Sequence, residues 1–183
     1  MPAQHEAPVH LVAYDQSWPA LFEAERTALS EILYPWLTGP IEHVGSTAVP
    51  GLPAKPVIDI MAGVDTLEAS RNALPPLKKF GYHYAPYRAE LMHWFCKPGL
   101  SVRTHHLHLV PFGSPLWKER LRFRDCLRSN PTVAGEYSAL KYHLAEIHRF
   151  DREAYTQAKG AFIGQVLHTL TAGDSDVTTH GAA

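Results

Sequence analysis

The strongest constraint on the fold is a pair of apolar segments joined by a loop that begins with Gly45-Ser46-Thr47. Ile41–Val44 is predicted to be a short strand, residues 45–56 a loop rich in glycine, proline and serine, and Val57–Val64 a second strand. The second strand carries one carboxylate, Asp59, inside its apolar run. A carboxylate there is costly unless it is paired, hydrogen-bonded or bound to a metal ion. Asp59 is therefore a candidate functional residue; the alternative interpretation is a strand-end turn with a solvent-facing Asp59.

The turn after the first strand has the composition of a phosphate-binding loop. Glycine at position 45 lets a phosphate group approach the backbone closely, because no side chain blocks it. The amides and hydroxyls of Ser46 and Thr47 can then hydrogen-bond to the phosphate oxygens. Gly45, Ser46 and Thr47 are therefore candidate nucleotide-binding residues.

The remaining apolar periodicity predicts a sheet covered by helices, of the α/β or α+β class. A first helix is predicted to run from Ser17 to the glycine and proline near position 39, and a second to cover Leu67–Phe80. Further strands are predicted at His10–Tyr14, Tyr82–Pro86, Leu91–Lys97 and Val102–Val110. The last third is predicted to form three helices, with caps at Ser114, Asn130 and Asp151.

Length and charge limit the domain count and the class of partner. A chain of 183 residues suits one domain, which we place at residues 9–170, with flexible termini at 1–8 and 171–183. The net charge of −1 gives no global attraction to nucleic acid or to an anionic membrane. Cys96 and Cys126 form no CxxC pair, and no segment has the pattern of a signal peptide or a membrane span. We therefore expect a soluble cytoplasmic protein with no membrane partner and no strong nucleic-acid signal.

A histidine pair lies in the predicted strand Val102–Val110. Side chains alternate along a strand, so Thr104, His106 and His108 share one face. Two imidazoles placed two residues apart can bind a single metal ion. The alternatives are histidines that hydrogen-bond within a polar cleft, or that contact a nucleotide directly without metal.

Several basic residues occupy unusual positions. Lys141 and Lys159 fall on or beside the apolar stripes of their predicted helices, where lysine is rare. Each either extends outward to solvent or points into a cleft to meet an anionic phosphate. Lys55, Arg103 and Arg124 are further candidates for a phosphate site. A solvated surface role is the alternative for each of these cations.

Two long motifs in the chain resemble known families. The hydrophobic-Gly-Ser stretch, the loop and the acidic strand resemble the signature of the nucleotidyltransferase superfold. Beyond the superfold, the chain is similar to the GrpB-like family over roughly residues 9–168. The similarity lies in Ile41–Ile60, Arg103–His108, Phe123-Arg124-Asp125, Tyr137 to Lys141 and Asp151 to Lys159. This resemblance implies an α+β fold, with a nucleotidyltransferase-like mixed sheet flanked by helices and a helical C-terminal cover.

One position departs from the pattern of the superfold. The superfold has a second acid two residues after the first, and here that position is Met61, as is common in the GrpB-like family. A thioether cannot replace an oxygen ligand for Mg²⁺. The superfold takes a third acid from a later central strand, and the resemblance implies that His106 and His108 occupy that place beside Asp59. Such a ligand set suits a transition metal such as zinc or manganese better than magnesium.

The resemblance implies metal-dependent transfer of a nucleoside monophosphate from a nucleoside triphosphate to an unidentified small-molecule or protein acceptor. Asp59 would be the catalytic carboxylate, and it should lie within about 10 Å of the imidazoles of His106 and His108, with Ser46 at the rim of the same cleft. One alternative is a non-catalytic nucleotide-binding or folding-accessory module, related to the domain that occurs fused to dephospho-CoA kinase. Another is a metal-dependent hydrolase that uses the same residues with water as acceptor.

Overall fold

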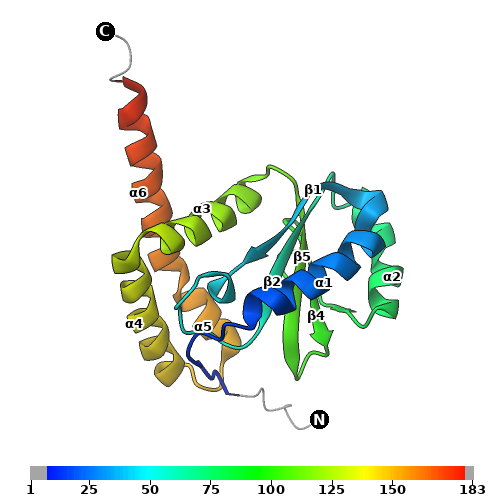
Figure 1. Ribbon diagram of the computed structural model, residues 1–183, viewed down its shortest axis with the longest axis horizontal. Helices are drawn as coiled ribbons and strands as arrows, with labels where there is room; N and C mark the ends of the chain where they lie inside the picture. Colours follow the sequence, from blue (N-terminus) through cyan, green and yellow to red (C-terminus); the bar gives the residue numbers. More distant parts are fainter. Residues whose placement is uncertain (1–7, 180–183) are drawn as a thin grey trace.

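The computed structural model describes the backbone of residues 8–179 and the side chains of residues 8–172, which form a five-stranded sheet flanked by helices (Figure 1). The strands are β1 (Leu37–Val44), β2 (Ile58–Val64), β3 (His83–Tyr84), β4 (His93–Pro98) and β5 (Arg103–Pro111). They lie in the order β1-β2-β5-β4-β3. β2 pairs with β5 in parallel and every other neighbouring pair is antiparallel. This mixed sheet confirms the α+β class.

One face of the sheet packs against helices α1 (Trp18–Leu33) and α2 (Leu74–Lys79). The buried positions of α1 recur at helical intervals, as the sequence predicts, and they are Trp18, Phe22, Glu25, Leu29 and Leu33. Alternate residues of the strands meet them, namely Ile58, Ile60, Ala62 and Val64 of β2 with Leu107 and Leu109 of β5. The period-two alternation therefore sends Asp59 and the two histidines to the opposite face.

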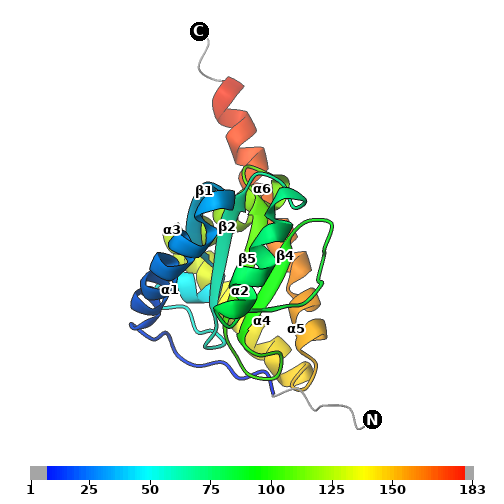
Figure 2. The same cartoon turned by 90° about the vertical axis from the view of Figure 1, so that its right-hand side faces the viewer.

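The opposite face is covered only in part by an apolar cluster. Helix α3 (Pro115–Ser129) packs Leu116 and Trp117 against Met61 and Val110 of the sheet. Helices α4 (Pro131–Ile147), α5 (Arg152–Ala158) and α6 (Gly160–Thr179) follow in the chain. Figures 1 and 2 show that α6 continues outward beyond the rest of the molecule. The C-terminal helices and this sheet face together form the walls of the cleft described below.

The predicted helix caps are confirmed. The Oγ of Ser114 accepts a hydrogen bond from the Trp117 amide, and the Asn130 side chain accepts one from the Val133 amide. Asp151 accepts a hydrogen bond from the Ala154 amide at 2.8 Å and begins α5. The described part of the C-terminal cover contains four helices rather than three, because α5 ends at Ala158 and α6 begins at Gly160.

Two predicted boundaries at the N-terminal side are wrong. His10–Tyr14 forms a single bridge, between Val12 and Ala54, instead of a strand. The first helix ends at Leu33, and the glycine and proline near position 39 lie inside β1. Gly39 has room there only because it lacks a side chain, since an added Cβ would collide with the ring of Phe112. Proline is tolerated because β1 is the edge strand of the sheet.

Two helical predictions also need correction. Leu67–Phe80 is divided into a short 3₁₀ segment, η3 (Ala69–Ala73), and α2, because the two prolines after Leu74 fit only the start of an α-helix. Helix α6 runs to Thr179, although the flexible tail was expected from residue 171. Residues 1–7 and 180–183 of the expected flexible termini lie outside the described residues.

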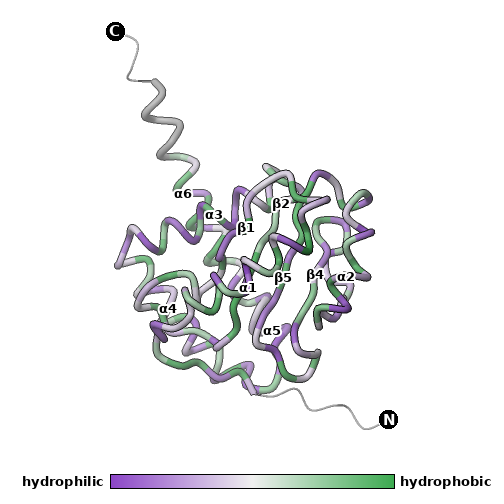
Figure 3. The backbone as a smooth tube through the Cα atoms, turned by 45° about the vertical axis from the view of Figure 1, so that its right-hand side comes forward, coloured by the Kyte–Doolittle hydropathy of each residue, from purple (hydrophilic) through white to green (hydrophobic). Residues whose placement is uncertain are grey.

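Figure 3 shows hydrophobic stretches along the central strands, with a hydrophilic stretch in β5. That stretch begins with Arg103 and contains the histidines.

Within residues 8–179, no helix is long and apolar enough to cross a membrane.

Candidate functional site

Asp59, His106 and His108 lie together on the face of the sheet opposite α1. The parallel register of β2 and β5 places Asp59 directly beside His106 and Met61 beside His108. The Nδ1 of His106 lies 2.9 Å from the Oδ1 of Asp59, and the Nε2 of His108 lies 3.7 Å from the same oxygen. Potential ligand atoms of the three residues all lie within 4.8 Å of one another. The predicted convergence of these side chains is confirmed.

The electrostatics of the group favour an ionised Asp59 and a neutral His108. Burial would raise the pKa of the Asp59 carboxyl, but its interactions with the neighbouring imidazoles, including the hydrogen bond with His106, outweigh burial and hold that pKa well below the usual value. Burial, reinforced by the charge of Arg120, lowers the pKa of His108 to about 3. The pair at neutral pH is thus a carboxylate facing an unprotonated imidazole.

The hydrogen bonding of His108 leaves one ring nitrogen available as a ligand. Its Nδ1 lies 3.4 Å from the thioether of Met92, and in the tautomer that donates this hydrogen bond the Nε2 carries the lone pair. Among the described residues, the buried Nε2 atoms of His106 and His108 have no hydrogen-bond partner. In that tautomer the lone pair of the His108 Nε2 faces the negatively charged Asp59 Oδ1, and the two repel each other. A cation bound between the two atoms would remove this repulsion.

The three side chains lie near the spacing of a divalent metal site, and their ligand atoms, all within 4.8 Å of one another, would close slightly around an ion. Ligands about 2.0–2.2 Å from a tetrahedral zinc ion lie about 3.3–3.5 Å from one another. The two separations from the Asp59 oxygen, 2.9 and 3.7 Å, lie on either side of that range. Three protein ligands leave a fourth position for water or substrate, as in catalytic zinc sites. Met61 is fully buried in the apolar cluster under α3 and supplies no ligand.

Gly45 is required by its contact with Asp59. Its φ of +72° lies in the left-handed region, and an added Cβ would lie 2.5 Å from the Oδ2 of Asp59. The absence of a side chain at Gly45 therefore leaves the space that the Asp59 carboxylate occupies. Ser46 and Thr47 follow in a short 3₁₀ turn, η2 (Ser46–Ala48). The Thr47 hydroxyl is buried and bonds to His43 and to the Val57 carbonyl, so it holds the loop in place.

We expect Gly45→Ala to destabilise the protein by about 2–4 kcal/mol, because the strained backbone and the contact with Asp59 add together. Gly51→Ala is a matched control. Its φ of +79° is similar, but nothing lies within 4 Å of an added Cβ. Urea denaturation of both variants measures the difference. Equal losses of unfolding free energy in the two would show that the contact with Asp59 contributes nothing.

Lys141 and Lys159 both point into the cleft. The Nζ of Lys141 is buried, lies 3.2 Å from the Ser46 Oγ, and also donates to the carbonyl of Pro53. Burial, together with the charge of Lys159, lowers the pKa of Lys141 to about 7. Burial, together with the charge of Lys55, lowers the pKa of Lys159 to about 8. Lys55 and Lys159 also lie over the ring of Tyr155, at 5.1 and 4.3 Å from its centre.

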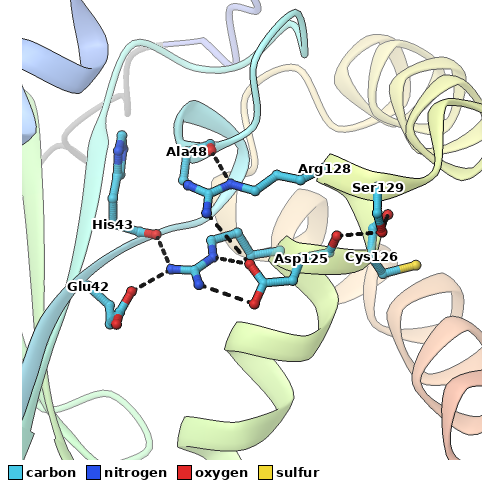
Figure 4. A network of polar contacts seen from close by, with 8 residues as sticks. Glu42, His43, Ala48, Asp125, Cys126, Arg128 and Ser129 are labelled. Atoms are coloured by element: carbon cyan, nitrogen blue, oxygen red, sulfur yellow. Dashed lines mark hydrogen bonds and ion pairs between the residues drawn. The ribbon is translucent and has the colours of Figure 1, made fainter.

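Arg103 and Arg124 line the same cleft but differ in their partners. The Arg103 guanidinium lies 5.3 Å from the ring centre of Trp94, and its Nε donates to the Leu100 carbonyl. Arg124 joins α3 to β1, because its Nη1 lies 2.6 Å from a Glu42 oxygen and donates to the His43 carbonyl, while its other nitrogens contact Asp125. Figure 4 draws this network, in which Arg128 contributes a bond to the Ala48 carbonyl. The described contacts of Arg124 therefore fix the position of α3.

Two further residues of the cleft are Arg120, which no sequence pattern singled out, and Tyr137, which was named only as part of the motif Tyr137 to Lys141. Both line the cleft, and the Tyr137 side chain is buried and hydrogen-bonded with Ser46. Arg120 lies one turn after Leu116 and one turn before Arg124 on α3. Lys141 was singled out because it is a cation within the apolar stripe of its helix. The same criterion, applied to the sequence of α3, would have identified Arg120.

The cleft that contains these side chains has a volume of about 780 Å³. This is within the usual range of small-molecule sites. It brings together every candidate residue of the sequence analysis, namely Gly45, Ser46, Thr47, Lys55, Asp59, Arg103, His106, His108, Arg124, Lys141 and Lys159. The bases of the cleft outnumber its acids, which suits an anionic ligand.

The fold and the site define a class: α+β proteins in which a mixed sheet carries a His-His-Asp group at the base of a basic cleft. The chain matches the model of a family described as "GrpB protein" over residues 8–169. It belongs to the GrpB family.

Relatives of known name or structure agree with this assignment. The glutamate-rich protein GrpB of Alkalihalophilus pseudofirmus is 34% identical over 167 residues, which are 88% of this chain and 95% of that protein. A crystal structure of the conserved protein GrpB from Enterococcus faecalis aligns with a TM-score of 0.76 and 34% identity, over 86% of this chain and 94% of that one. A dephospho-CoA kinase of Mycolicibacterium paratuberculosis is 29% identical over 185 residues, with 84% of this chain matching 44% of the kinase.

Proposed function

We propose that this protein is a metal-dependent nucleotidyltransferase, which transfers a nucleoside monophosphate from a nucleoside triphosphate to an acceptor. The observation that carries the proposal is the position of the metal-capable group. Asp59, His106 and His108 share one basic cleft with the Gly45-Ser46 turn. The order of strand, Gly-Ser turn, loop and acidic strand also agrees with the nucleotidyltransferase signature, and this supports a relation to that superfold.

Each group in the cleft suits a step of nucleotidyl transfer. The amide of Gly45 and the hydroxyl of Ser46 would bind oxygens of the triphosphate, and Lys141 and Lys159 would neutralise its charge. An acceptor oxygen would form a bond to the α-phosphorus while the bond to pyrophosphate breaks, and the acceptor's proton would pass to water. Asp59, His106 and His108 would hold a metal ion, which polarises the phosphate oxygens and neutralises developing charge.

The ligand set favours a transition metal over magnesium. Two imidazoles and one carboxylate match zinc or manganese, whereas magnesium prefers oxygen ligands and octahedral geometry. The buried Met61 leaves no second carboxylate on β2 to bind a second ion. A single softer ion is therefore the cofactor that we propose.

Nucleotide binding tests the proposal. We expect nucleoside triphosphates to raise the melting temperature in the presence of Zn²⁺ or Mn²⁺ and to have little effect with Mg²⁺ alone, because ligands of the folded state stabilise it. Affinity should fall between about pH 7 and about pH 9, since an anion favours the protonated lysines, whose pKa values in the free protein are about 7 and about 8. Lys141→Met should weaken binding and flatten this dependence, and Lys118→Met on the exposed side of α3 is the control. Binding that is unchanged by pH and by Lys141→Met would contradict the assigned role of Lys141.

A second function is favoured by one specific relative. The match with the M. paratuberculosis kinase covers 44% of the kinase's length. That protein therefore contains a region similar to this chain together with further sequence that does not match it. That arrangement suits a non-catalytic nucleotide-binding or folding-accessory module. Under this alternative, changes at Asp59 leave cellular function intact, whereas polar substitutions among the buried residues of α4 and α5 abolish it.

A further inference from the structure

Five of the cations that line the cleft form two groups, which come from different elements. The lysine group lies on the loop before β2, on α4 and at the junction of α5 and α6, and consists of Lys55, Lys141 and Lys159. The arginine group lies between β3 and β4 and on α3, and consists of Arg88 and Arg120. The proposed function uses only the lysine group.

Asp59 interacts electrostatically with both groups. Lys159 is influenced by the charges of Lys55 and Asp59, whereas Arg120 is influenced by those of Asp59, Arg88 and Glu119. Asp59 is the member common to both sets, so each group lies within electrostatic reach of the metal-capable side chains. A ligand that contacts both groups therefore also lies near these side chains.

Arg120 has unusually few partners for a partly buried cation. In the described part of the chain, its hydrogen-bond partner is the thioether of Met92, at 3.6 Å, and no carboxylate oxygen lies within ion-pair distance of it. The same sulfur accepts from the Nδ1 of His108, so one side chain separates Arg120 from a proposed metal ligand. Arg124, one turn further along α3, is by contrast paired with Glu42 and Asp125. Burying a cation without a carboxylate in direct contact is costly, and an anionic ligand that pairs with it directly would offset that cost.

We propose that Arg88 and Arg120 bind a phosphate group of the acceptor, so that the acceptor is a phosphorylated small molecule. This inference rests on the proposed function, in which the lysine group holds the triphosphate. A guanidinium binds a phosphate through two parallel hydrogen bonds, and this geometry fixes the ligand's orientation as well as its charge. The arginines would hold the acceptor on one side of the metal group while the triphosphate lies on the other.

The test uses two probes that do not depend on the nucleotide base. Tripolyphosphate is first titrated into the full-length protein with one equivalent of Zn²⁺, and inorganic phosphate is then titrated into the saturated complex by calorimetry. We expect phosphate to bind the saturated complex. Arg120→Gln should weaken this binding at least about tenfold and change tripolyphosphate affinity less than about threefold, because charge-assisted hydrogen bonds are strong and local. Lys159→Gln should weaken tripolyphosphate binding at least about tenfold and change phosphate affinity less than about threefold.

Two further variants of α3 test whether the effect is specific to the guanidinium of Arg120. Arg120→Lys keeps the charge and should retain part of the phosphate affinity, whereas Lys118→Gln removes an exposed charge and should change neither titration. The inference is overturned if phosphate does not bind the saturated complex, or if Arg120→Gln weakens both probes equally. A failure of the proposed function alone has a different signature, in which both probes bind as expected but nucleoside triphosphates do not.

Discussion

Asp59→Asn is expected to reduce nucleotidyl transfer by about a thousandfold. Asparagine keeps the shape of the side chain but removes the negative charge, which the structure places 2.9 Å from one imidazole and 3.7 Å from the other. Losses of this size are typical when a group that positions transition-state charge is removed. The assay incubates the protein with labelled nucleoside triphosphates, Zn²⁺ or Mn²⁺ and a fraction of phosphorylated metabolites, and follows the label in new products.

Asp65→Asn is the matched control for this experiment. Asp65 is exposed and directly follows the last residue of β2. Its substitution therefore also removes one negative charge, but at a position outside the cleft. We expect full transfer in that variant. Transfer that survives in Asp59→Asn would remove Asp59 from its role as the catalytic carboxylate.

The second large effect concerns the metal. Replacing both His106 and His108 by alanine should weaken Zn²⁺ binding by more than about a hundredfold, since even outer-shell partners of metal ligands contribute about 10–100-fold. Competition with a chromophoric chelator measures the affinity. His143→Ala, on the exposed side of α4, controls for the loss of a surface histidine. Circular dichroism of each variant confirms that the fold is retained, and affinity that is equal in the double variant and the wild type would contradict the assignment of the histidines.

The local pattern of the sequence was sufficient to predict the centre of the site. Period-two alternation in an apolar strand gives the face of Asp59, His106 and His108 without knowledge of the fold. The register between β2 and β5 could not be predicted in the same way, because it depends on pairing between strands that are more than forty residues apart in the sequence. No local pattern in either strand contains that long-range information.

The residues that the sequence analysis missed or misassigned depend on tertiary contacts. Gly39 reads as a turn residue, yet it lies in β1 because the ring of Phe112 packs on it. Arg124 is predicted to be a phosphate ligand, and only the structure shows that its guanidinium is also paired with Glu42 and Asp125. Arg120 carries the same helical signal, and only the structure shows its contact with the Met92 thioether and its proximity to Asp59 and Arg88. Which cations are paired and which face the cleft cannot be deduced from spacing alone.

The most direct measurement of the central claim is anomalous diffraction from crystals grown with Zn²⁺ and a non-hydrolysable nucleoside triphosphate. The account predicts one strong anomalous peak about 2.0–2.2 Å from ligand atoms of Asp59, His106 and His108, with a phosphate oxygen completing the coordination. Phosphate density should continue from there toward Ser46 and Lys141. An empty position among these three side chains, with the nucleotide or the metal bound elsewhere, would contradict it.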